Sequence, residues 1–167
     1  CLLALMLSAV PAALAQETTD TQPDLADAPD TQPDQRLEKL LAFDDSKLND
    51  RQKQLYYRQL GLYLLRVGRD KQWATAERIA RRMLELFPDL PEVHFNLASA
   101  LAGQDKLNDA LDELAVAVDK GYSNAAAMKS ADNFERLREN ERFVELVKKA
   151  RHRELADAKK RYEKGTE

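Results

Sequence analysis

The sequence predicts an all-α protein built as a short stack of antiparallel helical hairpins. The first observation is an internal repeat with a period of about 34 residues, in which 73–80 recurs in pattern as 107–114. In each copy Ala follows three residues after Trp73 or Leu107, and an apolar residue comes four positions later. This period, with two helices per unit, is typical of stacked hairpins. The second observation is the composition, with 33% charged residues, 7% aromatic residues, five glycines and six prolines, which suits a soluble helical protein.

The first fifteen residues have the pattern of an export signal. They carry no charge and end in Ala13-Leu14-Ala15, a small-x-small cleavage site. We expect a signal peptide over 1–15, with a natural start before Cys1, and a periplasmic or secreted protein. The run is shorter than the roughly 20 apolar residues that span a bilayer, so no membrane span is expected after cleavage. An uncleaved N-terminal anchor is the alternative. Cys1 is the only cysteine, so the mature chain would have no disulfide.

Residues 16–35 have the composition of a disordered linker. They hold six acidic residues, three prolines and no basic residue, and such a segment cannot bury enough apolar surface to fold. A solvated spacer is the main interpretation, and attraction of a basic partner is the alternative. Without these six negative charges the formal net charge of −3 becomes +3 for 36–167. Because acidic residues are interleaved with the basic ones, we expect a solvated helical surface and no nucleic-acid binding.

The first helices of the domain are predicted from capping residues and apolar period. A short amphipathic segment over 37–43 comes first. Asn49 and Gln52 predict a capping box at the start of the next helix, which we expect to end at Gly68. Asp70 is expected to cap the third helix. The apolar stripes of these two helices are Tyr56, Leu60, Tyr63, Leu64 and Val67, then Trp73, Ala76, Ala80, Met83 and Phe87.

The fourth and fifth helices form the clearest predicted hairpin. Pro91 suits the first turn of the fourth helix because its missing N–H is not needed there, and Gly121 is a left-handed cap for the fifth. Ala98 and Ala110 are expected where the two backbones approach most closely. The other core residues expected here are His94, Leu97, Leu101, Leu107, Leu111, Leu114, Ala117 and Val118.

Beyond Gly121 the pattern weakens into a terminal cap. We expect a short helix over 123–130, an irregular stretch over 132–138, and a long charged helix over 140–167 that packs on the stack. The apolar side of this last helix is predicted as Phe143, Val144, Val147, Leu155, Ala158 and Tyr162.

Residues 51–121 resemble two tetratricopeptide repeats. The matches are the Leu-Gly pair of the first helix, the small residue of the second and the closing proline, namely Leu60-Gly61, Leu97-Ala98, Ala76, Ala110 and Pro88. The segment 120–143 resembles a degenerate final unit. The chain departs from the family in a longer loop before Trp73 and in lacking the closing proline of the second repeat. The resemblance implies a right-handed superhelical repeat domain over 36–139.

The resemblance also implies that the first helices of the repeats line a concave groove for a peptide. The side chains expected there are Leu55, Arg58, Leu62, Leu65, Glu92, Phe95, Asn96, Ser99 and Ala102. Leu62 stands where a carboxylate-clamp Asn would be needed, so we expect recognition of apolar side chains. For Phe95 the alternative is that it packs against the next unit.

No catalytic constellation is visible in the sequence. The five glycines form no phosphate-binding cluster, and His94 and His152 lack a zinc-ligand spacing. We interpret His94 and Trp73 as packing residues. The sequence predicts a non-catalytic adaptor or scaffold, without cofactor or metal, that binds a protein or peptide in an envelope assembly. The alternatives are a self-associating structural protein, as a homo-oligomer, and an accessory subunit of an envelope enzyme complex.

Overall fold

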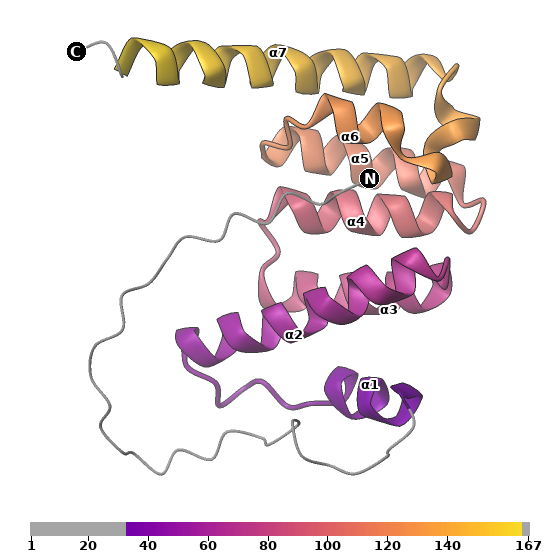
Figure 1. The fold of residues 1–167 in the computed structure, drawn as a ribbon, viewed down its shortest axis with the longest axis vertical. Coiled ribbons are helices and arrows are strands. Elements are labelled where there is room, and N and C mark those ends of the chain that lie inside the picture. Colours follow the sequence, from indigo (N-terminus) through magenta and orange to yellow (C-terminus); the bar gives the residue numbers. More distant parts are fainter. Residues whose placement is uncertain (1–32, 165–167) are drawn as a thin grey trace.

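The computed structural model describes residues 33–164, which form seven α-helices and one 3-10 helix without a β-strand (Figure 1). The all-α prediction is confirmed. The elements are α1 (Pro33–Leu41), α2 (Asp50–Arg69), α3 (Trp73–Leu86), α4 (Pro91–Ala102), α5 (Leu107–Lys120), α6 (Ala125–Ser130), η1 (Asp132–Leu137) and α7 (Glu141–Lys164). The predicted signal peptide and residues 16–32 of the predicted linker lie outside the described residues.

Helix α1 corrects the end of the predicted linker. The helix begins at Pro33, so 33–35 belong to it and not to the linker. Proline is well suited to this first position because its φ is already helical and its missing N–H would be unpaired there. Leu37 and Leu40 are buried in a cluster that also holds Tyr56 and Leu60 of α2 and residues of α3, which gives this short helix a tertiary reason to form.

The capping box of α2 is confirmed. The Gln52 backbone N–H donates to Asn49 Oδ1 at 2.9 Å, and the Asn49 backbone N–H donates to Gln52 Oε1 at 3.0 Å. The predicted end of α2 and the predicted cap of α3 were wrong. Helix α2 continues through Gly68 to Arg69, and Asp70 ends α2 instead of capping α3, whose first turn has no side-chain cap.

The turns before α3 and α5 repeat each other in detail. Lys71 and Asp105 both adopt positive φ, at 56° and 62°, and lie one repeat length apart. The Gln72 N–H donates to Val67 O at 2.8 Å, and the equivalent Lys106 N–H donates to Leu101 O at 3.0 Å. The turn before Trp73 therefore has the same geometry as the turn before Leu107, and the longer interval from Leu60 to Trp73 than from Leu97 to Leu107 lies within α2. The 34-residue period corresponds to a repeated backbone geometry.

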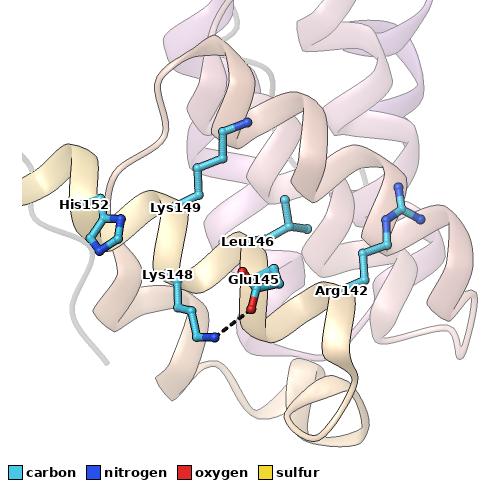
Figure 2. Close-up of a pocket in the computed structure, with 6 residues that line it drawn as sticks. All are labelled: Arg142, Glu145, Leu146, Lys148, Lys149 and His152. Carbon is cyan, nitrogen blue, oxygen red and sulfur yellow. Dashed lines mark hydrogen bonds and ion pairs between the residues drawn. The ribbon is translucent and has the colours of Figure 1, made fainter.

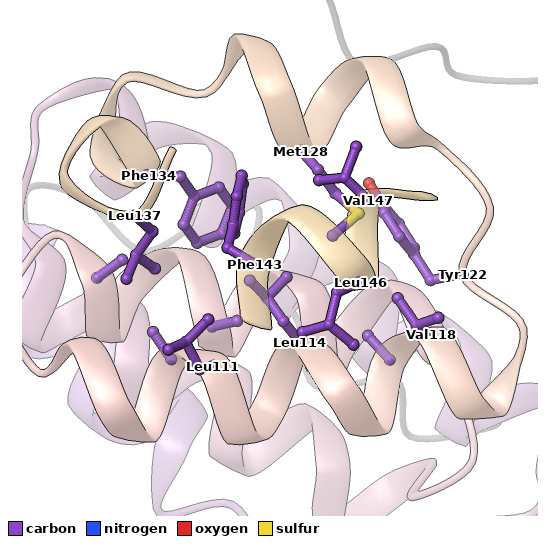
Figure 3. Packing of buried hydrophobic residues seen from close by; sticks show 14 of the residues in the cluster. Leu111, Leu114, Val118, Tyr122, Met128, Phe134, Leu137, Phe143, Leu146 and Val147 are labelled. Atoms are coloured by element: carbon purple, nitrogen blue, oxygen red, sulfur yellow. The ribbon is translucent and has the colours of Figure 1, made fainter. Parts of the chain in front are cut away.

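Consecutive helices pack on one another from α2 to α5, and their buried residues form two clusters. The first cluster joins α1, α2, α3 and one side of α4. The second joins α4, α5, α6, η1 and α7 (Figure 3). Ala98 and Ala110 are fully buried in the second cluster, as predicted for a close approach of α4 and α5. Trp73 is confirmed as a packing residue, because a Cβ built on Gly103 would lie 2.4 Å from its ring.

The elements after α5 pack against α4 and α5 and against one another. Gly121 has φ of +121°, which confirms the predicted left-handed cap. Helix α6 begins at Ala125, two residues later than expected, because Asn124 Oδ1 accepts the Ala127 N–H at 2.9 Å. The residues of α7 that are buried on the stack are Phe143, Leu146, Val147 and Ala150.

The second half of α7 corrects the predicted apolar stripe. Leu155 and Tyr162 are 52% and 75% exposed, and Ala158 is also exposed. Beyond Ala150 only Arg153 and Glu154 are partly covered, and every residue from Leu155 to Lys164 is exposed. Figure 1 shows this half running past the other helices. None of the helices within 33–164 has both the length and the apolarity to cross a membrane.

Candidate functional site

The nine predicted groove residues divide between two helices with different surroundings. Helix α2 holds Leu55, Arg58, Leu62 and Leu65, and helix α4 holds Glu92, Phe95, Asn96, Ser99 and Ala102. The four α2 residues lie on or beside its solvent side, while three of the α4 residues make contacts inside the protein.

Phe95 packs against the following unit, which confirms the alternative. Its ring stacks on Tyr122 with centroids 4.4 Å apart, and meets the edge of Phe134 at 5.7 Å. Figure 3 shows Tyr122 and Phe134 within the second cluster. Much of the apolar area of the Phe95 ring is thus used inside the protein, although the residue is only half-buried.

Ser99 and Ala102 also face the inside. Asn133 Nδ2 of η1 donates to Ser99 Oγ at 2.5 Å and to its carbonyl oxygen. Ala102 is only 4% exposed. The burial of Ala102 argues against it as a partner contact, because neighbouring segments cover this part of α4. Phe95 and Ser99 are half-buried, and their role as partner contacts stays a prediction. Asn96 is half-buried and Glu92 is exposed.

Glu92 affects two neighbouring phenols. Burial raises the pKa of Tyr57 and of Tyr122, and the negative charge of Glu92 raises both further. Both phenols thus stay neutral, Tyr57 at the edge of Phe87 and Tyr122 stacked on Phe95.

The outer face of α2 is open. Leu62 is 68% exposed and Leu55 is 42% exposed, whereas the core side of the same helix buries Tyr56, Leu60 and Val67. At about 100° per residue, Leu55 and Leu62 lie on the side of α2 opposite this core.

Four arginines accompany these leucines. We use the name α2 ridge for Arg51, Leu55, Arg58, Leu62, Leu65, Arg66 and Arg69. The four arginines are exposed, and none of them has an ion pair among residues 33–164. Asp50 is the one acidic residue of α2. The sequence prediction missed Arg51, Arg66 and Arg69, although their helical spacing from Leu55 and Leu62 could have identified them.

Helix α2 holds the ridge in a fixed position. The Tyr56 hydroxyl donates to Leu40 O at 2.5 Å and accepts from Arg82 Nε at 3.1 Å. Arg82 also donates to Asp45 Oδ1 at 2.6 Å and lies 5.4 Å from the Tyr56 ring centroid. The hydrogen bond from Arg82 lowers the pKa of Asp45. These contacts tie α2 to α1, to the loop after α1 and to α3, and they fix the helix that carries the ridge in the fold.

A second candidate surface lies on α7. A shallow depression of about 370 Å³ is lined by Arg142, Glu145, Leu146, Lys148, Lys149 and His152 (Figure 2). Lys148 pairs with Glu145 at 2.6 Å and Arg142 pairs with Asp112 at 2.6 Å. Lys149 pairs with Asp119. Because its charges already have partners, this depression is not the better candidate.

The polar residues of the core have structural partners. His94 is buried and its two ring nitrogens lie 2.8 Å from Glu113 Oε2 and 3.0 Å from Pro88 O, which confirms it as a packing residue. Across 33–164 there is no group of three His, Cys, Asp or Glu placed to hold a metal ion.

No protein family, curated protein or solved structure matches this chain. The α2 ridge is accordingly the better candidate for a binding surface.

Proposed function

We propose that this chain is a non-catalytic protein-interaction module of the tetratricopeptide-repeat class, which binds a polypeptide through the α2 ridge. The observation that carries the proposal is the exposure of Leu62 and Leu55 on one side of helix α2. Large apolar side chains grouped on an ordered surface mark interaction sites more often than isolated ones do.

Two features support the repeat class. The turns at Lys71 and Asp105 share their dihedral angles and hydrogen bonds at the interval of one repeat. Ala76 and Ala110, the small residues expected at equivalent positions, are both buried. Repeats of this class act by presenting helix faces to a polypeptide, and α2 is the first helix of the first unit in this interpretation.

We also propose that the module is exported and works in an envelope assembly. The support is the sequence of 1–15, with its uncharged apolar run and its Ala-x-Ala end. The absence of cysteine after Cys1 is compatible with an oxidising compartment.

The test is photo-crosslinking in the native host with the full chain. A benzophenone amino acid is placed at Gln54, an exposed residue beside the ridge, and at Asn108, an exposed residue of α5, as the control. We expect one dominant foreign protein from the Gln54 position only. In Leu62→Ser the crosslink should be lost while thermal stability stays within about 0.5 kcal/mol, because a side chain 68% exposed contributes little to the core.

Two results would contradict the proposal. An unchanged crosslink in Leu62→Ser would remove the ridge from the binding surface. Crosslinks only to a second copy, with a concentration-dependent mass in solution, would support the self-associating structural protein instead. A dominant partner that is an envelope enzyme would identify the chain as an accessory subunit, with the ridge as its contact.

A further inference from the structure

We propose that the α2 ridge docks an acidic amphipathic helix of another protein. The inference rests on the proposed function and adds the chemistry of the partner. It is carried by three properties of the ridge: its spacing, its charge and its arrangement of apolar and basic side chains.

The spacing of the ridge fits a helix. Its members from Arg51 to Arg69, with Arg66 left aside, follow one another at intervals of four, three, four, three and four residues. This is the alternation of the a and d positions of a heptad, the seam along which two helices pack. The three leucines, Leu55, Leu62 and Leu65, are the apolar knobs of that seam. An extended strand, whose side chains repeat every two residues, does not match this interval.

The charge of the ridge selects an acidic partner. Arg51, Arg58, Arg66 and Arg69 are exposed and form no ion pair within the described residues. Several other exposed arginines of the described residues are paired, as in Arg78 with Glu38 at 2.7 Å and Arg142 with Asp112 at 2.6 Å. Three unpaired guanidinium groups in the seam, with that of Arg66 beside it, repel other cations and attract carboxylates, which they can hold in a bidentate manner. A partner with Glu or Asp between its apolar residues completes these pairs.

The same charge disfavours a second copy of the chain. In a symmetric parallel pair of helices, each seam position faces its own equivalent, so Arg58 would face Arg58. In an antiparallel pair the two sets of arginines would still share one interface that offers no carboxylate. Like charges in an interface oppose association and favour a different partner.

The arrangement of side chains separates a protein partner from a lipid surface. Helices that lie on membranes divide their apolar and basic residues between two faces. Here Arg58 stands between Leu55 and Leu62 on the same line, so burial of the leucines in lipid would draw the guanidinium in with them. A helix with alternating apolar and acidic residues satisfies both kinds of side chain at once.

The experiment uses the full chain and two fluorescein-labelled probe peptides of three heptads each. The acidic probe has Leu at a and Glu at d, and the basic probe has Lys in place of Glu. Anisotropy titrations are run at low and at physiological ionic strength. The variants are Arg58→Glu and, as a control of equal charge change, Arg138→Glu, an exposed arginine after η1 with no ion pair in the described part of the chain.

We expect saturable one-to-one binding of the acidic probe, weakened at higher ionic strength because salt screens exposed charges. Arg58→Glu should weaken this binding roughly fivefold, since a favourable pair is replaced by repulsion, and should strengthen binding of the basic probe. Arg138→Glu should leave both unchanged.

Four results would overturn the inference. They are equal affinity for both probes, an unaltered affinity in Arg58→Glu, preferential binding to phosphatidylglycerol vesicles, and a dimer held through Leu62. Displacement of the acidic probe by a peptide of residues 16–32 at a lower concentration than by the unlabelled probe would assign the ridge to the chain's own acidic segment.

The crosslinking experiment separates this inference from the proposed function. A partner that is lost in Leu62→Ser but retained in Arg58→Glu would leave the binding module in place and remove its preference for acidic helices.

Discussion

Glu77 joins helix α3 to the turn that precedes α5. Its carboxylate accepts hydrogen bonds from Lys106 Nζ at 2.7 Å, from Gln104 Nε2 at 2.9 Å and from Arg81 at 2.8 and 2.9 Å. The side chain is only 14% exposed. Burial opposes its ionisation, but the hydrogen bonds from Lys106, Arg81 and Gln104 outweigh burial and lower the pKa of Glu77 from 4.5 to about 2.

The size of this contribution follows from the pKa difference. One pKa unit corresponds to about 1.4 kcal/mol, so the full difference would be worth about 3 kcal/mol. The side chains of Lys106 and Arg81 are 43% and 56% exposed, and water around them weakens the interaction. We therefore expect Glu77→Gln, which keeps the shape and removes the charge, to lower the free energy of unfolding by about 1–3 kcal/mol at neutral pH.

The pH dependence has a definite sign. Because the folded pKa of Glu77 is depressed, its stabilisation is fully present above pH 4.5 and is lost as the pH falls through 4.5 toward 2. The difference in unfolding free energy between the wild type and Glu77→Gln should shrink over this window and vanish near its lower end.

Urea unfolding followed by circular dichroism, at a series of pH values from neutral to about the folded pKa, measures this difference. Glu139→Gln is the control, since this exposed carboxylate forms no ion pair within residues 33–164, and it should match the wild type throughout. A difference for Glu77→Gln that stays constant with pH would refute the electrostatic reasoning and leave only a packing effect.

Two further predictions concern glycines and a helix cap. Gly103→Ala should lower the unfolding free energy by about 1–3 kcal/mol, because the new methyl would meet the ring of Trp73. Gly61→Ala should raise the unfolding free energy by about 0.5–1 kcal/mol, because the position in α2 has open space for a methyl. Equal effects of the two variants in thermal unfolding would contradict the packing argument. Asn49→Ala should cost about 1 kcal/mol by removing the capping box of α2, and Asn49→Asp, which retains the acceptor, should recover most of this loss in the same assay.

Several features could be predicted from the sequence because their causes are local. The capping box at Asn49, proline at the start of α4 and the left-handed Gly121 each depend on a few neighbouring residues. The 34-residue period was visible because each unit repeats the same short-range pattern. Leu55 and Leu62 are exposed on α2, and their role in binding stays a prediction.

The remaining features depended on tertiary contacts, which spacing along the chain does not encode. Phe95 was assigned to a groove, but its environment is set by Tyr122 and Phe134, residues that the segment after α5 brings onto α4. The Glu77 contacts with Gln104 and Lys106 require the start of α3 to lie beside the turn between α4 and α5.

The exposed end of α7 is a similar case. Its periodicity marks an apolar side, but the neighbouring helices decide how far that helix is covered, and this left Leu155 in solvent. The local sequence was thus sufficient for the helices and their repeat, because capping and periodicity act over a few residues. Which apolar side chains are buried and which are exposed depended on the tertiary structure, because burial is decided by the segments that pack opposite each side chain.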